Sequence, residues 1–494
     1  MNIGTAADLM GAQARQLSAE LFDKEIVGFS IDSRTTGAGE LFFALSQSDY
    51  ARAGFNGTFA DAHRFIPQAF SKGAVAAVAR RERVEGDAEL QAMSGRLLLV
   101  EDAIAALQTL ARKVYEAWAR PVVAITGSAG KTTAKELTAH LLRAAGRRVL
   151  KSERNYNNGL GLPLAVLQMV TEGRRPDDFD IAVLEMGMSS PTHEIERLCQ
   201  ITPPDIGVEL LVAPVHLEHL GTIENIAAAK AELIEGLKPG GTAILNADDE
   251  RVIAMRAKTN GPVITFGVEN AADVMAADID TGRFGRSRFR LRTPTGEAEA
   301  ELNMPGLHNL MNALAAAAVA TCFGMKAEEI ARALEGVTPA KMRGEVIDFA
   351  AGFTVVDDSY NSNPRSLLGI VHTLAEGGAR ARRRLVIAGE MLELGPEGAK
   401  MHREAGREIA ESGIDLLWGV RGLASEMIEG ARAAGMSESA TRFFETSAQA
   451  AIAICEEVRE GDLLLVKGSR GVETDKVVKA LRDRYPTLGA DERG

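Results

Sequence analysis

The chain is poor in cysteine and in aromatic residues, and it lacks a long apolar run. Its three cysteines, Cys199, Cys322 and Cys455, are widely separated in apolar or helical surroundings, so we expect small buried side chains and neither a disulfide nor a metal site. No stretch approaches the roughly 20 apolar residues of a membrane-spanning helix, and the N-terminus lacks the basic-then-apolar layout of a secretion signal. We therefore expect a cytoplasmic protein without stable membrane insertion.

The chain also has fewer basic than acidic residues. The 494 residues include 56 Lys and Arg against 68 Asp and Glu, which gives a formal net charge of -12. Nucleic acids and anionic membranes attract proteins with an excess of Lys and Arg, so we expect neither as a partner. The 46% of hydrophobic and 25% of charged residues are typical of a globular protein. A chain of this length is expected to form two to four domains, and we expect it to be a monomer.

Apolar strand-like runs alternate with helical stretches along the chain. The first segment ends in an amphipathic helix at Ala103–Trp118, and the second reads as a parallel sheet with helices on both faces and a small antiparallel insertion at Val274–Leu302. After Arg343, four further strands predict another open parallel sheet, whose ligands would lie beyond the carboxyl ends of its strands. We predict an α/β fold with three domains, at residues 1–119, 120–340 and 341–494.

The stretch Pro121–Thr133 carries the most specific functional signal. Its apolar residues Val122–Ile125 suit a buried strand that feeds a helix predicted at Ala134–Ala145. Between the two, glycines let the backbone turn around an anion, Lys131 can reach the outer phosphates, and a threonine can hold Mg²⁺. The loop is a contracted variant, because Ile125 stands where the general phosphate-loop pattern has its first glycine. We predict a nucleoside triphosphate site formed by Thr126, Gly127, Ser128, Ala129, Gly130, Lys131, Thr132 and Thr133.

Charged and titratable side chains of the central segment lie at or after the ends of two of its predicted strands and in the helical run Ile226–Ile234. Glu185 ends an apolar strand, where it could hold Mg²⁺ beside the loop or be a solvated strand-end acid. The His216-Leu-Glu-His219 spacing differs from that of metalloprotease zinc ligands, so we expect one histidine near a magnesium-phosphate site, and His219 could be structural. Lys230 is flanked by apolar residues, which favours a snorkelling surface lysine. If Lys230 is buried near metal ions, reaction with CO₂ to an anionic carbamate would turn repulsion into ligation.

Side-chain amides gather in two further places. The loop Asn155-Tyr-Asn-Asn158 offers donors and acceptors that suit a sugar or peptide substrate, although an Asx-rich turn that caps the next helix would also explain it. Asn309 could cap a helix predicted at Asn309–Phe323, whereas Asn312, one turn inside, could read an adenine edge. In the last segment, polar residues cluster at the predicted strand ends Asp357–Asn361, Gly389-Glu390 and Lys467–Arg470.

Taken together and in order, these motifs resemble the Mur ligase family, the ATP-dependent enzymes that build the peptide stem of bacterial cell-wall precursors. The resemblance covers nearly the whole chain and rests on Thr126–Thr133, Asn155-x-Asn-Asn158, Glu185-Met-Gly187, His216-Leu-Glu218, Ala229-Lys-Ala-Glu232, Gly306-x-His-Asn309-x-x-Asn312 and Arg343. Five other segments look most like the members that add D-alanyl-D-alanine: Asp32-Ser-Arg34, Gly39–Leu45, Asp358–Asn363, Gly389–Gly395 and Lys467–Arg470.

The resemblance implies a smaller N-terminal α/β domain that grips a uridine nucleotide, a central P-loop ATPase with a parallel sheet and a C-terminal Rossmann-like domain. It implies ATP and Mg²⁺ as cofactors, with the metal ions served by Thr132, Glu185, His216 and a carbamylated Lys230. Lys131 would hold phosphates. The remaining nucleotide contacts would come from Asn309 and Asn312 at the adenine, Arg343 near the phosphates and Asp358 on the ribose.

The implied activity joins D-alanyl-D-alanine to a UDP-N-acetylmuramoyl-tripeptide through an acyl phosphate. The implied substrate contacts are Ser33, Arg34, Asn155, Asn158, Asn361, Asn363, Lys467, Ser469 and Arg470. Three positions depart from the family pattern, with Leu211 in place of asparagine, His193 in place of glycine and Glu390 in place of aspartate. The nearest alternatives are a ligase that adds a single amino acid, including folylpolyglutamate synthase, and a nucleotide-switched binding protein. The last would need a base-reading Asn-Lys-x-Asp motif, which the sequence lacks.

Overall fold

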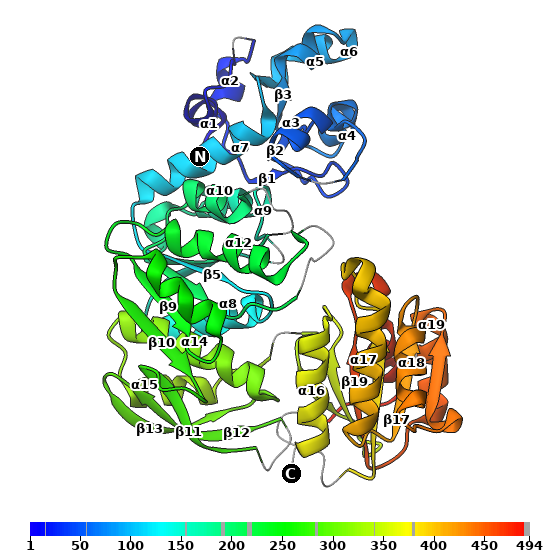
Figure 1. Cartoon of the computed structure of the whole chain (residues 1–494). Coiled ribbons are helices and arrows are strands. Elements are labelled where there is room, and N and C mark those ends of the chain that lie inside the picture. The colour runs from blue at the N-terminus through cyan, green and yellow to red at the C-terminus, as the bar shows by residue number, and fades with distance from the viewer. Residues whose placement is uncertain are drawn as a thin grey trace.

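The computed structural model describes residues 1–14, 16–55, 57–153, 156–188, 193–214, 220–281, 285–339, 341–377 and 381–488. Three separate sheets organise these residues into three α/β domains. The N-terminal domain lies at one end of the central domain, and the C-terminal domain lies beside the central domain (Figure 1). The predicted fold class is therefore confirmed.

The N-terminal domain contains a four-stranded parallel sheet in the order β1-β2-β3-β4. Its strands are β1 (Gly28–Ser30), β2 (Glu40–Phe43), β3 (Ala76–Arg80) and β4 (Leu97–Val100). Helix α7 (Ala103–Trp118) begins where the side chain of Asp102 accepts hydrogen bonds from the backbone N–H groups of Ile104 and Ala105. The apolar face of α7 belongs to a core cluster that continues into the central domain, so this helix packs the two domains together.

The central domain contains a nine-stranded sheet in the order β13-β12-β11-β10-β9-β8-β5-β7-β6. Its strands are β5 (Val122–Thr126), β6 (Val149–Lys151), β7 (Ile181–Glu185), β8 (Ile206–Glu209), β9 (Thr242–Asn246), β10 (Val263–Gly267), β11 (Val274–Asp280), β12 (Ser287–Thr293) and β13 (Gly296–Leu302). The predicted antiparallel insertion is an extension of this sheet, because β11 pairs in parallel with β10 before β12 and β13 continue antiparallel.

Helices cover both faces of the central sheet. Alternate residues of β5 point to opposite faces, and all five are buried, as its run of apolar residues predicts. One face packs against α8 (Lys131–Ala144), α14 (Leu307–Cys322) and α15 (Ala327–Glu335). The other face packs against α9 (Gly161–Leu167), α10 (Glu194–Ile201) and α12 (Ile223–Glu235).

The C-terminal domain contains a six-stranded sheet in the order β14-β15-β19-β16-β17-β18. Its strands are β14 (Glu345–Asp348), β15 (Thr354–Asp358), β16 (Arg383–Gly389), β17 (Leu416–Val420), β18 (Thr441–Phe444) and β19 (Asp462–Lys467). The four predicted strands form the parallel centre, and the two strands that the sequence did not reveal lie at the edges, where β14 is antiparallel. The flanking helices include α16 (Pro364–Gly377), α17 (Gly398–Glu411) and α18 (Ala424–Ala433). None of the helices described here is long and apolar enough to cross a bilayer.

Candidate active site

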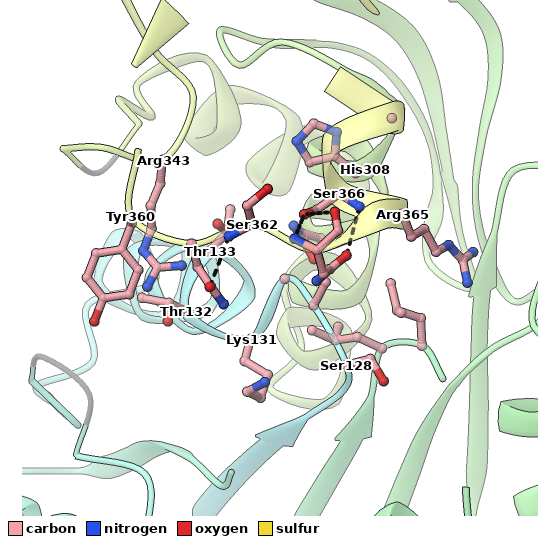
Figure 2. A pocket seen from close by; sticks show the side chains of 18 of the residues that line it. Ser128, Lys131, Thr132, Thr133, His308, Arg343, Tyr360, Ser362, Arg365 and Ser366 are labelled. Carbon is pink, nitrogen blue, oxygen red and sulfur yellow. Dashed lines mark hydrogen bonds between the residues drawn. The ribbon is translucent and has the colours of Figure 1, made fainter. Parts of the chain in front are cut away.

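A cavity of about 890 Å³ lies between the central and C-terminal domains. The central domain contributes the phosphate loop, the end of β7 and the start of α14, and the C-terminal domain contributes the ends of β15 and β19 and the start of α16. Figure 2 shows side chains from both domains around this space, with Arg343 and Tyr360 next to Thr132 and Thr133. The carboxyl ends of two parallel sheets thus meet at one site, as expected for ligand binding in α/β folds.

The phosphate loop is held in a conformation that glycine makes possible. Gly127 has a φ of 149° and Gly130 a φ of 85°, and both values are unfavourable for other residues. The Ser128 N–H donates a 2.8 Å hydrogen bond to the carbonyl oxygen of Leu211, and the Ser128 hydroxyl donates to the carbonyl oxygen of Ala213 at 3.0 Å. Helix α8 begins directly after Gly130, three residues earlier than predicted. Its first residues line the cavity, and the unpaired N–H groups of a helix N-terminus favour an anion there.

Lys131, Thr132 and Glu185 form a compact group beside the loop. The Lys131 ammonium donates to the carbonyl oxygen of Gly127 at 2.8 Å, and burial lowers its pKa. The Thr132 hydroxyl donates to one carboxylate oxygen of Glu185 at 2.8 Å, and the Asn157 amide donates to the other at 2.9 Å. Glu185 is 4% exposed, so the alternative of a solvated strand-end acid is wrong. Asn157 lies in the predicted amide loop Asn155–Asn158, but its pairing with Glu185 was not predicted.

Lys230 is buried on α12, with 2% of its surface exposed, so the alternative of a snorkelling surface lysine is wrong. Burial, together with the nearby positive charge of Lys131, lowers the pKa of Lys230 to about 7. The carboxylate that opposes both effects is Glu209, which ends β8 with no exposed surface. Burial raises the pKa of Glu209 to about 8. Glu209 was not predicted as a site residue, although it is a lone charge within residues 206–213, which are otherwise apolar or glycine.

Two predicted sites fall in segments outside the described residues, namely His216 and Asn155. Asn158 lies at the cavity, where its side-chain oxygen accepts the N–H groups of Leu160 and Gly161 at 3.2 and 2.8 Å. This is the helix-capping alternative for the amide loop. These contacts use only the side-chain oxygen of Asn158 and not its amide nitrogen.

Both predicted amides of α14 are buried and line the cavity. The Asn309 amide donates to the carbonyl oxygen of Pro305 at 2.7 Å, which holds the start of the helix. Asn312 lies against the phosphate loop, since a Cβ atom added to Gly130 would be 2.3 Å from the Asn312 side-chain oxygen. The structure therefore brings Asn312 together with the loop.

The C-terminal domain presents several of the predicted residues to the same cavity. The Lys467 ammonium donates to Asp358 at 2.5 Å and to the carbonyl oxygen of Asn361 at 3.0 Å. The Arg343 guanidinium lies 3.9 Å from the centre of the Tyr360 ring. Others that line the cavity are Asn363, which accepts the N–H of Ser366 at the start of α16, Ser469, which accepts the N–H of Leu392, and Arg470.

The predicted uridine contacts, Ser33 and Arg34, do not line this cavity and lie in the N-terminal domain. The Ser33 hydroxyl donates to the side-chain oxygen of Gln68 at 3.0 Å. Arg34 forms a 2.7 Å ion pair with Asp32, and its side chain is 83% exposed. A substrate that contacts both regions would have to extend from the N-terminal domain to the cavity.

The three departures from the family pattern have local explanations. Leu211 braces Ser128 through its backbone carbonyl, a contact that any side chain permits. His193 has a φ of 53°, the left-handed conformation for which glycine is the ordinary choice, and its ring lies 3.2 Å from carboxylate oxygens of both Glu196 and Glu232. Glu390 directly follows β16, and its carboxylate accepts the N–H of Leu423, just beyond the end of β17, at 3.1 Å.

Comparison with known proteins identifies the family. Residues 125–320 match the Mur ligase middle domain, and residues 342–470 match the glutamate ligase domain of Mur ligases. UDP-N-acetylmuramoyl-tripeptide--D-alanyl-D-alanine ligase of Bacillus subtilis is 33% identical over 92% of this chain and 93% of its own length. The Escherichia coli enzyme of the same name is 32% identical over 94% of this chain and 96% of its own length.

Solved structures agree with the sequence relatives. A crystal structure of MurF from Acinetobacter baumannii superimposes with a TM-score of 0.82 at 28% identity, covering 98% of both chains. The MurF ligase of Thermotoga maritima in complex with ADP has a TM-score of 0.74 at 27% identity, covering 92% of this chain and 98% of its own. Folylpolyglutamate synthase of Mycobacterium tuberculosis, at 16% identity and a TM-score of 0.59, shares the fold alone.

The fold and the phosphate loop define a P-loop ATPase built for amide ligation, and the chain belongs to the Mur ligase family. Within the family, its similarity over nearly full length places it with the ATP-dependent ligases of MurF type.

Proposed function

We propose that this chain joins D-alanyl-D-alanine to the free carboxylate of a UDP-N-acetylmuramoyl-tripeptide while ATP is converted to ADP and phosphate. The observation that carries the proposal is the single cavity that holds Lys131, Thr132 and Glu185 on one wall and Asp358 and Lys467 on the other. The full-length similarity to relatives with this activity supports it. We also propose that the chain acts as a cytoplasmic monomer, with domain boundaries near residues 119 and 340.

The proposed reaction has two steps. An oxygen of the tripeptide carboxylate attacks the γ-phosphorus, the bond to the β-γ bridging oxygen breaks, and ADP leaves an acyl phosphate behind. The D-alanyl-D-alanine amine, in its unprotonated form, then attacks the acyl carbon, the carbon–oxygen bond breaks, and inorganic phosphate leaves as the amine loses a proton. Lys131 and the N-terminus of α8 stabilise the negative charge on the transferred phosphoryl group. The two domains around the cavity exclude water that would hydrolyse the acyl phosphate.

The residues present fit magnesium and a nucleotide. Thr132 and Glu185 already share a hydrogen bond and would hold the first ion, and the buried oxygens around Lys230 suit a second hard cation. When bound, Mg²⁺ neutralises phosphate charge and orients the attacking and leaving oxygens. His216 and Lys230 are the proposed residues for the second ion. Asn309, Asn312, Arg343 and Asp358 would hold the nucleotide.

Carbamylation of Lys230 is part of the proposal. Only an unprotonated amine reacts with CO₂, forming an N–C bond and releasing a proton. Because burial lowers the pKa of Lys230 to about 7, a substantial fraction of the amine is unprotonated at neutral pH. The carbamate would replace a cation with an anion at the position where a metal ion is proposed.

The remaining predicted residues are proposed to bind the organic substrates. Ser33 and Arg34 would contact the uridine diphosphate, and Asn155 and Asn158 would lie along the path to the reaction centre. On the C-terminal side, the D-alanyl-D-alanine contacts would be Asn361, Asn363, Lys467, Ser469 and Arg470. Their position across the cavity from Lys131 would bring the amine to the acyl phosphate.

The test is a panel of acceptors and amines assayed for ADP release and for the ligated product by mass spectrometry. Acceptors are UDP-N-acetylmuramoyl precursors with dipeptide and tripeptide stems, the latter ending in meso-diaminopimelate or lysine, together with a folate. Amines are D-alanyl-D-alanine and single amino acids. We expect ADP release only with a tripeptide precursor plus D-alanyl-D-alanine. Efficient ligation of a single amino acid, or ADP release without any amine, would replace this proposal with one of its alternatives.

A further inference from the structure

Glu209 is a buried carboxylate without a partner. It has no exposed surface, and neither of its oxygens has a hydrogen-bond partner in the described part of the chain. Burying an ionised carboxylate in this way is strongly unfavourable unless it is paired or bound to a metal ion. A buried carboxylate of this kind therefore indicates a ligand that interacts with its oxygens.

The direction of Glu209 follows from the sheet register. Glu209 pairs with Thr126 on the neighbouring strand, and in-register residues of parallel strands point to the same face. Gly207, two residues before Glu209, lies against Leu233 and Ile234 of α12, so this face is the one that α12 covers. The hydroxyl oxygen of Thr126 is also buried and without a partner. Two strand ends thus place three unsatisfied oxygens beneath the helix that carries Lys230.

The charges around Glu209 connect this group to the reaction centre. The positive charges of Lys230 and Lys131 both stabilise the Glu209 carboxylate, so Glu209 lies close to the phosphate-binding lysine as well as to Lys230. Glu209 nevertheless makes no hydrogen bond to either lysine. These polar groups lie near one another without hydrogen bonds between Glu209 and the lysines, which suits a site that binds an ion.

We propose that Glu209 is a direct oxygen ligand of the second divalent cation, on the same ion as the carbamate of Lys230. The inference rests on the proposed function, because that function supplies the second ion. Mg²⁺ binds carboxylate oxygens, and a carbamate and a carboxylate on facing elements would repel each other unless a cation lay between them. Glu209 thereby adds a charge that the family motifs of this chain do not include. The Lys230 carbamate and the second ion then depend on each other for stability.

The experiment counts bound metal without requiring turnover. Mn²⁺ replaces Mg²⁺ as a paramagnetic probe and is titrated by electron paramagnetic resonance into the full chain saturated with an ATP analogue that has a non-hydrolysable β-γ bond. For the wild type we expect two ions per chain. For Glu209→Gln we expect the first ion to bind normally and the second to bind at least tenfold more weakly. The matched control is Glu235→Gln, because Glu235 lies on α12 and forms an ion pair with Lys258 away from the cavity.

The inference would be overturned if Glu209→Gln bound both Mn²⁺ ions as tightly as the wild type does. It would also be overturned if the wild type bound only one Mn²⁺ ion. Glutamine has the same shape as a protonated Glu209. If Glu209 only filled space in the fold, Glu209→Gln would therefore leave both Mn²⁺ affinities unchanged. If Glu209→Gln lowers the melting temperature, Glu209→Asp in the same titration decides, and we expect its shorter carboxylate to weaken the second ion alone. Ligation by the wild type is measured separately. A wild type that binds two ions through Glu209 but makes no product would refute the proposed function and leave this site standing.

Discussion

The hydroxyl of Thr132 donates a 2.8 Å hydrogen bond to the carboxylate of Glu185, which joins the first turn of α8 to the end of β7. Asn157 holds the second oxygen of the same carboxylate at 2.9 Å. Both Thr132 and Glu185 offer oxygen atoms, and both are fixed before any ligand arrives. This arrangement is what a magnesium site beside a triphosphate requires.

We expect Thr132→Ala and Glu185→Gln each to raise the Mg²⁺ concentration needed for half-maximal turnover by about tenfold or more. The double variant should lose less than the product of the two single losses, because the residues act on one ion. A Mg²⁺ titration of ADP release at saturating substrates measures this. Thr138→Ala is the control, since Thr138 is buried on the same helix but does not line the cavity. Unchanged Mg²⁺ dependence in both single variants would contradict the assignment.

Lys131→Ala should lower turnover by roughly 100-fold or more, on the order of 3 kcal/mol in the activation barrier, because one preorganised positive charge is lost from the phosphoryl group. Steady-state ADP release in the presence of both substrates measures the effect. The exposed Lys113, paired with Glu116 on α7, provides the control variant Lys113→Ala. Near-normal ligation by Lys131→Ala would remove the phosphate loop from the mechanism.

Lys230→Ala should abolish turnover, and short carboxylic acids in the buffer should restore part of it, because a free carboxylate can occupy the space of the carbamate. The matched control is Lys131→Ala, which lacks a cation and should not recover with the same acids. Activity is measured across a series of formate, acetate and propionate concentrations. A Lys230→Ala variant with ordinary activity would show that the carbamate is not needed.

Sequence patterns predicted the parts of this molecule that depend on short-range order. Strand β5 follows from its apolar run, helix α7 from its amphipathic pattern, and the phosphate loop from the glycines and lysine between strand and helix. The burial of Lys230 did not, because a lysine among apolar residues is equally consistent with a helix surface. Only the packing of α12 on the central sheet distinguishes the two.

The edge strands and the contacts between domains also could not be predicted from the sequence. β14 and β18 are short, and their identity as strands depends on the neighbours that pair with them. The meeting of Lys131 with Asp358 and Lys467 in one cavity depends on how two domains lie against each other, which no local pattern encodes. Glu209 could have been found, because it is a lone charge within residues 206–213, which are otherwise apolar or glycine.

His402 gives the C-terminal domain a pH dependence of stability. Its ring is buried, its Nδ1 donates to the carbonyl oxygen of Gly398 at 2.7 Å, and its Nε2 accepts the N–H of Met391 at 2.9 Å. Only the neutral ring satisfies both bonds, and burial lowers its pKa. Below about pH 6.5 the unfolded chain binds a proton that the folded chain excludes, so the free energy of unfolding falls as the pH drops towards the lowered pKa.

We expect His402→Asn to be less stable than the wild type at pH 7.5 by about 1 kcal/mol, because at least one buried hydrogen bond is lost. The variant should also lose less further stability than the wild type between pH 7.5 and 5.5. Urea unfolding at the two pH values, followed by tryptophan fluorescence, measures both differences. Equal pH slopes in the two proteins would contradict the assignment of the neutral ring.

Gly130 and Asn312 test whether the contact between loop and helix is required for nucleotide binding. A Cβ atom at residue 130 would lie 2.3 Å from the Asn312 oxygen and would stand on a backbone with a φ of 85°. Gly130→Ala should therefore weaken ATP binding by tenfold or more. Gly146 provides the matched control, because its φ is 77° and nothing lies within 4 Å of its added Cβ. Gly146→Ala should cost about 1–2 kcal/mol of stability from the left-handed backbone alone and leave ATP binding unchanged.

The double variant Gly130→Ala with Asn312→Gly separates the two causes. Removing the Asn312 side chain relieves the clash with residue 130 but also removes a proposed nucleotide contact. The double variant should therefore lose less ATP affinity than the product of the two single losses. Calorimetric titration of ATP, with Asn312→Gly alone in parallel, gives the coupling energy between the two sites. A double variant whose loss of ATP affinity equals the product of the two single losses would show that backbone strain alone, and not the clash, weakens binding in Gly130→Ala. Normal ATP binding by Gly130→Ala would show that the loop adopts another conformation when the nucleotide is bound.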